Sequence, residues 1–290
     1  FVAAKQPFYT EEWLKFTMNG VEYVIVVTDA VTIDYTKPRS YTDSNGNVYL
    51  GGYYMEIGIS KYGSFGTSKA PDSAWGFHCE KNAPDTAWLS GGSNFGQLGL
   101  LIDEDGWGNG NVPTSGDFFV PGTPEERWIF AYYLDGVKHQ YIVADRMNVI
   151  PSDWAVNPQA VDTSHGDTLS CTVTGVTDMG VQVSFTYSFG VYDKQYNTSL
   201  RVVNNSGKSI SEVRFVRSFD PDQDQWTKNT YKTYNKVICN PDPAKPAGDT
   251  NYCLVVARGE KTLNAFFFLI FDNRVRASHG GSVGGVGSAY

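Results

Sequence analysis

The chain has 290 residues, of which 41% are hydrophobic and 19% charged, with a formal net charge of −8. It is long enough to bury a full core. The acidic balance and the scattered Lys and Arg residues exclude a nucleic-acid partner, and the longest apolar run, residues 265–271, is far shorter than the ~20 residues of a membrane span.

Aromatic residues make up 14% of the chain and, together with many Val and Thr residues, they favour strands over helices. Helical signals are short. Residues 10–13 and residues 123–126 resemble helix starts, the second with a Pro at the first helical position. Each segment is long enough for one helical turn.

Three tight turns predict antiparallel hairpins in the first half of the chain. Asn-Gly and Asp-Gly pairs accept the positive φ angles that a two-residue turn requires. Such pairs occur at residues 19–20, 45–46 and 135–136. The strands that we expect around them are 13–18 with 21–28, 39–42 with 48–50 and a slightly longer loop, and 128–134 with 137–143.

Residues 69–91 contain a short internal repeat, in which Ala-Pro-Asp-Ser/Thr-Ala-Trp ends at Trp75 and again at Trp88. The pattern is typical of two similar turns, each with a Trp ring packed over a sheet edge. The alternative is that Trp75 and Trp88 are displayed for stacking on sugar rings.

A Gly-rich loop follows the apolar residues 98–102 and offers several oxygen ligands. The residues that could hold Ca²⁺ in this loop are Asp103, Asp105, Asn109 and Asn111. The loop is not an EF-hand, because its glycine comes at the fourth position and Thr114 occupies the twelfth. Turn formation explains the same residues without a metal, so Ca²⁺ remains one of two interpretations.

The sequence contains no recognisable catalytic motif, and we expect no enzymatic activity. Paired carboxylates for glycoside hydrolysis could come from several acidic residues, but their separation in space is not a property of the sequence. Gly280-Gly-Ser-Val-Gly284 has the spacing of a nucleophile elbow and lacks the downstream partners that such a site needs.

The second half of the chain shows the alternation of antiparallel strands. Apolar residues at positions 181, 183, 185 and 187 alternate with polar ones at 182, 184, 186 and 188. Residues 200–203, 212–217 and 254–257 are further strand candidates. Residues 265–271 are apolar throughout, which is typical of a strand buried on both faces.

These elements predict an all-β protein, built as a large antiparallel β-sandwich with helices of one turn. Pro151 and Asn157-Pro158 interrupt the strand pattern near residue 150 and suggest a boundary between two β halves. We therefore expect an N-terminal half at 1–150, a C-terminal half at 151–278 and a Gly-rich tail at 279–290.

The cysteines and two sequons favour an extracellular location. Cys239 and Cys253 flank a loop rich in Pro and Gly, and we expect a disulfide between them that would stabilise the fold by roughly 3 kcal/mol. The alternative is two separate buried thiols. Asn197 and Asn204 begin acceptor sequons for N-glycans, and a chain that starts with Phe is consistent with a removed leader.

The Gly-rich tail predicts self-assembly. Glycine loses much conformational freedom on ordering, so such a tail is ordered when it joins a sheet, in the same subunit or in the next one. Small residues of the tail would fit between larger side chains on an acceptor sheet, and an aromatic residue ends the tail. The residues that we expect to make this contact are Gly281, Val283, Gly284, Val286 and Tyr290. The expected partners are copies of the same chain.

In overall build the chain resembles subunits of extracellular pilus-like filaments that assemble by strand exchange. The resemblance implies head-to-tail contacts that do not close on themselves and so form filaments. In the chaperone-dependent members of that group the donated strand is N-terminal, so residues 1–8 are an alternative donor, although Pro7 would end the strand early.

A second hypothesis is a carbohydrate-binding or polysaccharide-processing protein, with glycans as partners. The strand rhythm of residues 196–204 and 211–220 resembles that of the large sandwich domains in mutarotase-like enzymes. The many Tyr and Trp residues fit sugar platforms, a broad β core and an intersubunit interface equally well.

Overall fold

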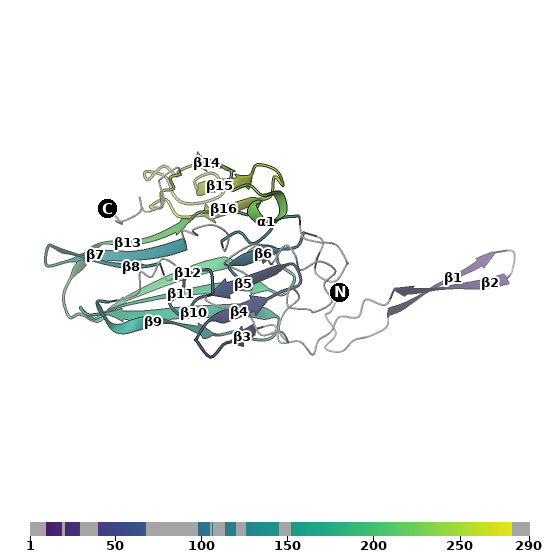
Figure 1. Ribbon diagram of the computed structural model, residues 1–290, viewed down its shortest axis with the longest axis horizontal. Coiled ribbons are helices and arrows are strands. Elements are labelled where there is room, and N and C mark those ends of the chain that lie inside the picture. The colour runs from purple at the N-terminus through teal and green to yellow at the C-terminus, as the bar shows by residue number, and fades with distance from the viewer. Residues whose placement is uncertain are drawn as a thin grey trace. The chain divides into compact units, whose positions relative to one another are not determined.

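The computed structural model describes residues 10–18, 21–29, 40–67, 98–104, 106, 114–119, 126–144 and 152–279 (Figure 1). The chain divides into two compact units, Phe1–Pro38 and Arg39–Tyr290. Within the described ranges, the structure consists of antiparallel strands and one four-residue helix, α1 (Gln225–Lys228). The predicted all-β class is confirmed.

The first unit contains a hairpin of β1 (Thr10–Met18) and β2 (Val21–Asp29), paired from Met18↔Val21 to Thr10↔Asp29. This confirms the hairpin predicted from Asn19-Gly20. The helical turn expected at residues 10–13 is wrong, because those residues belong to β1. Continuous pairing with β2 outweighs the local helix-start pattern.

The second unit contains a four-stranded sheet whose strands follow the order β12-β11-β10-β9. Its members are β9 (Trp154–Asp162), β10 (Thr168–Thr177), β11 (Val181–Gly190) and β12 (Asn197–Asn204). Along β11 the odd-numbered residues from Val181 to Phe189 are buried, whereas the even-numbered ones are partly exposed. The alternation predicted for this segment is confirmed.

Two further sheets pack on the buried face of this sheet and complete the sandwich. One contains β3 (Ser40–Thr42), β4 (Val48–Gly51), β5 (Met55–Ile59) and β6 (Leu100–Ile102) in that order, and the other has the order β13-β7-β8, from β7 (Glu126–Leu134), β8 (Val137–Val143) and β13 (Ile210–Phe219). The Trp128 ring centroid lies 5.1 Å from that of Phe185, and the Phe65 centroid lies 4.8 Å from that of Tyr187. All three sheets therefore share one core.

The boundary predicted near residue 150 does not separate two bodies. β13 pairs with β7 from Ile210↔Leu134 to Phe219↔Glu126, so strands from both predicted halves lie in one sheet. β12 and β13, which flank the turn at Gly207, pair with different strands, β11 and β7. This connection crosses between the layers of the sandwich.

The predicted turn residues take the conformations that their hairpins require. Asp135 and Gly136 have φ angles of 50° and 78°, the two positive values of a type I′ turn between β7 and β8. Gly46, with φ of 83°, turns the chain between β3 and β4. Both hairpins agree with the prediction.

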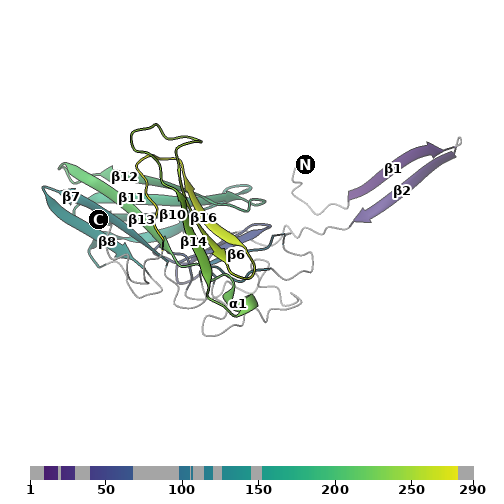
Figure 2. The ribbon, with the colours of Figure 1, turned by 90° about the horizontal axis from the view of Figure 1, so that it is seen from above.

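A fourth, C-terminal sheet of this unit has the order β14-β15-β16 and contains β14 (Thr233–Cys239), β15 (Cys253–Gly259) and β16 (Ala265–Ile270). Its strands run across the direction of β7 and β13 (Figure 2). Phe266 and Phe268 of β16 lie with ring centroids 5.2 Å and 4.6 Å from that of Phe219 at the end of β13. These rings attach one face of the C-terminal sheet to the sandwich.

A buried ion pair within the sheet β13-β7-β8 is hydrogen-bonded to the facing sheet and to the turn after β5. The side chains of Arg217 on β13 and Glu126 on β7 are 11% and 2% exposed and bind each other directly. Glu126 also accepts the backbone N–H of Phe65, and Arg217 donates to the hydroxyl oxygen of Tyr187. The Tyr187 hydroxyl in turn donates to the carbonyl of Gly63 at 3.0 Å.

Replacing Arg217 tests this junction. The Arg217→Met substitution leaves the Glu126 carboxylate buried without its cation, which should lower the free energy of unfolding by about 3–5 kcal/mol. Urea unfolding followed by tryptophan fluorescence measures this loss. The matched control is Arg214→Met on the same strand, where the ion pair with Glu212 has side chains 45% and 58% exposed and is worth at most about 1 kcal/mol. Equal losses from the two substitutions would contradict a structural role for the buried pair.

Candidate assembly surface

The outer face of the C-terminal sheet combines exposed apolar side chains of β16 with half-buried ones of β15. Because side chains alternate along a strand, Phe267 and Leu269 leave the face opposite to that of Phe266 and Phe268, and they are 48% and 43% exposed. The register places Val256 beside Phe267 and Leu254 beside Leu269. We call Leu254, Val256, Phe267 and Leu269 the apolar face.

This arrangement corrects the prediction for residues 265–271. β16 is half-buried on one face, where it packs on Phe219, and exposed on the other, and is not buried on both. A continuous apolar sequence is typical of a strand that is covered on both faces. In the described part of the chain, no element covers the outer face of β16. Contiguous exposed apolar side chains of this kind mark interaction surfaces.

Cationic side chains border the apolar face. Lys236 of β14 lies opposite Val256, on the same face of the sheet. The Arg258 guanidinium lies 5.6 Å from the centroid of the Tyr234 ring, and these two residues are also a register pair. In a chain with a net charge of −8, this surface combines apolar contact area with positive charge. It is therefore suited to a partner surface that is apolar at its centre and acidic around it.

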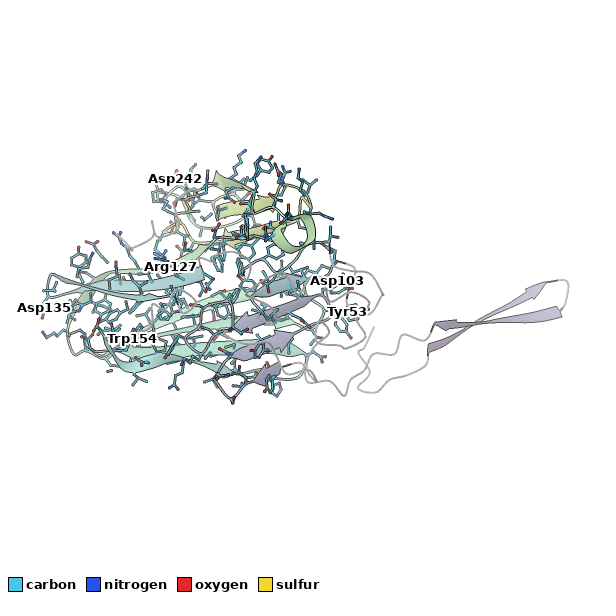
Figure 3. All side chains as sticks on the ribbon, in the orientation of Figure 1. Tyr53, Asp103, Arg127, Asp135, Trp154 and Asp242 are labelled. Carbon is cyan, nitrogen blue, oxygen red and sulfur yellow. The ribbon has the colours of Figure 1, made fainter. Side chains whose placement is uncertain are left out.

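Two asparagines shape the loop between β14 and β15 and the segment after β16. The Asn251 side chain accepts the N–H of Asp242 at 2.7 Å and donates to the carbonyls of Lys245 and Pro246 at 3.0 Å and 2.9 Å. The loop that it holds carries Asp242, labelled beside the C-terminal sheet in Figure 3. Asn240, the residue after β14, accepts the N–H of Ala277 at 2.7 Å and donates to its carbonyl at 3.0 Å.

The predicted disulfide between Cys239 and Cys253 is not formed in this structure, where both thiols are free. The register shift between Val237 and Cys239 sets Cys239 opposite Leu254. Cys253 is therefore one residue out of alignment, and its side chain leaves the other face of the sheet. Two Cβ atoms that point apart do not form a disulfide without backbone movement. Burial of Cys253 raises the pKa of its thiol, and the nearby Cys239 raises it further.

The loop proposed for Ca²⁺ is described only at its start. Asp103 is 1% exposed and lies after β6, at the end of the sandwich where Figure 3 also labels Tyr53. Asp105, Asn109 and Asn111 lie outside the described residues. Among the His, Cys, Asp and Glu residues that the structure describes, no group of three or more could hold a metal ion.

A polar junction near Asp103 brings together segments that are far apart in the sequence. The Asn264 side chain donates to Glu104 and, at 3.1 Å, to the Ser115 hydroxyl. Gln223 donates to the Asn264 carbonyl at 2.9 Å. Sequence reasoning missed this junction, because single Asn, Gln and Ser residues in separate loops carry no local signal.

Asp222 follows β13 and directly precedes Gln223, a member of this polar junction, in the sequence. It is 7% exposed, and its backbone N–H donates to the Phe118 carbonyl at 2.8 Å. Burial raises the pKa of Asp222 to about 7, and the negative charge of Asp220 adds to this effect. The group therefore binds a proton in the folded state at a pH where the unfolded chain has released it.

The remaining predicted site residues fall into two groups. Asn197 and Asn204 are exposed at the two ends of β12, and the Asn204 side chain accepts the Ser206 hydroxyl at 2.6 Å within its own sequon. Seven residues lie outside the described part of the chain: Trp75, Trp88, Gly281, Val283, Gly284, Val286 and Tyr290.

Comparison with protein-family models, with curated proteins and with solved structures gives no match to this chain. In the part of the chain that the structure describes, no helix is long and apolar enough to cross a membrane.

The raised pKa of Asp222 predicts a pH dependence of stability. Between about pH 4 and pH 7 the unfolded state releases the Asp222 proton while the folded state keeps it, so stability falls as the pH rises through this window. Asp222→Asn should remove this component and raise the stability at pH 8 by on the order of 2 kcal/mol.

Urea unfolding at pH 4.5 and pH 8 measures the Asp222 effect, with the exposed Asp153→Asn as the control. The control should follow the wild-type pH profile. If Asp222→Asn and wild type show the same pH dependence, the carboxyl is ionised in the folded state and the assignment is wrong.

Proposed function

We propose that this chain is a structural subunit of an extracellular assembly, in which copies associate head to tail and the terminal segment of one copy adds a strand to a sheet of the next. The observation that carries the proposal is the apolar face of the C-terminal sheet. This sheet also has two outer strands, β14 and β16, each with one edge that pairs with no other strand of the described chain.

The exposed side chains supply part of the association energy. Burying the remaining surface of Phe267 and of Leu269 would contribute about 1 kcal/mol each. Association loses translational and rotational freedom, so these contacts need further interactions beside them. An added strand supplies main-chain hydrogen bonds along a free edge, and these also fix direction and register. Head-to-tail contacts of this type produce filaments when the rotation between copies does not close.

The extracellular location of this proposal is supported by the two sequons. Asn197 and Asn204 are both exposed, as an acceptor of an N-glycan must be in the folded protein. Trp75 and Trp88, on which the alternative of sugar binding depends, lie outside the described residues. Self-assembly is therefore the function with a described surface behind it.

Substitution on the apolar face should weaken association. Phe267→Ser combined with Leu269→Ser removes about 2 kcal/mol of burial per contact, which corresponds to about 30-fold weaker binding between copies. Sedimentation velocity over a concentration series measures the change. The control combines Val161→Ser and Val213→Ser, which alter side chains 56% and 43% exposed on β9 and β13. Equal association of the two double variants would place the interface elsewhere.

Removal of the tail tests the donor segment. We expect filaments of the full chain in negative-stain electron microscopy and single particles of a chain that ends at Ser278, because the shortened chain lacks the strand that it would donate. A chain lacking residues 1–8 is the matched control and should still form filaments. Filaments from the chain ending at Ser278, or their loss on removal of residues 1–8, would contradict donation by the tail.

A further inference from the structure

The segment before the tail is fixed at one end of β14. Asn240 directly follows β14, and its side chain pairs with both the N–H and the carbonyl of Ala277, at 2.7 Å and 3.0 Å. A side-chain amide that binds both backbone groups of one residue acts as a short piece of strand pairing. It brings the chain back beside the C-terminal end of β14 just before residue 280.

β14 offers a free edge at this point. In the described chain it pairs with β15 along one edge, and the backbone groups of its other edge have no strand beside them. Tyr234 and Ile238 on this strand are 47% and 49% exposed. A free edge with apolar side chains is a template for another strand.

The direction and length of residues 280–290 match this edge. A segment that starts beside Asn240 and follows β14 toward Thr233 runs antiparallel to it, as β15 does on the other side. The seven residues of β14 span about 24 Å at ~3.4 Å per residue. Eleven extended residues reach further than this, so the segment covers the whole edge.

The composition of residues 280–290 also suits strand addition at this edge. The segment contains no Pro, so each backbone N–H is available for pairing, and it contains no charged residue to be desolvated. Its Gly, Ala and Ser residues leave room for the exposed Tyr234 and Ile238 side chains. Val283 and Val286 differ in parity and would therefore project from opposite faces of the extended sheet.

We propose that residues 280–290 add to the free edge of β14 in their own subunit, as a fourth strand of the C-terminal sheet, and that this docking regulates assembly by closing the edge until a neighbour's tail replaces it. The inference rests on the proposed self-assembly for its regulatory part. Exchange of an identical strand between copies keeps the same hydrogen bonds, so the docked monomer and the assembly differ by little free energy per contact.

Photo-crosslinking at a concentration below assembly tests the docking by itself. With Ala277 beside Asn240, the antiparallel register places position 283 beside Tyr234. Irradiation of the Val283→p-benzoylphenylalanine variant should therefore join position 283 to residues 233–236 within the monomer band, as mapped by mass spectrometry of tryptic peptides. Asn240→Ala should lower the yield of this adduct about tenfold, because it releases Ala277. Asn273→Ala, which removes a 2.8 Å hydrogen bond to the Lys245 carbonyl in the neighbouring loop, should leave the yield unchanged.

Hydrogen exchange supplies a second readout that needs no substitution in the sheet. Amides on the free edge of β14 should exchange at least tenfold more slowly in the full chain than in the chain ending at Ser278. Adducts outside β14, adducts confined to a dimer band, or equal exchange in the two chains would overturn the docking. Those results would not contradict the proposed self-assembly. Electron microscopy of the chain ending at Ser278 tests self-assembly separately.

Discussion

The second unit depends on the buried ion pair between Arg217 and Glu126. An isolated charge in this position would be strongly destabilising, so each partner requires the other and both require the surrounding hydrogen bonds. The Arg217 guanidinium lies 5.1–5.6 Å from the ring centroids of Phe219, Tyr187 and Phe65, which exclude water from it. The pair joins β13 to β7 and, through Tyr187 and Gly63, holds β11 and the turn after β5 in place. It fixes how the layers of the sandwich meet.

The position of the C-terminal sheet follows from the same strand. Phe219 lies two residues after Arg217, and its ring contacts Phe266 and Phe268 of β16. One face of β16 is thereby committed to the sandwich. Phe267 and Leu269 point outward from the other face. Successive side chains of a strand leave opposite faces, so a single layer beside the strand covers only every second side chain of an all-apolar sequence. An exposed apolar face is thus a direct result of how β16 packs on the end of β13, and the proposed association depends on this face.

The sequence predicted the local features and missed the long-range ones. Asp135-Gly136 identified its hairpin because these two residues make up the whole turn. Asn45-Gly46 identified a hairpin with a longer loop, residues 43–47, in which Gly46 supplies the positive φ angle. The pairing of β13 with β7 and the contact between Glu104 and Asn264 join segments with no shared local signal. The disulfide prediction followed the Pro- and Gly-rich loop that Cys239 and Cys253 flank, yet the one-residue register shift after Val237 determines the direction of each Cys side chain. Of the candidate surface, the sequence identified the apolar run at 265–271 and assigned it two buried faces where the structure has one.

The most direct test of the account is hydroxyl-radical footprinting of the full chain over a concentration range that spans the proposed association. The account predicts that oxidation of Phe267 and Leu269 decreases in the associated state, while oxidation of Val161 and Val213 on the sandwich does not change. Undiminished oxidation of Phe267 and Leu269 in the associated state would contradict the claim that the apolar face of the C-terminal sheet is the assembly surface.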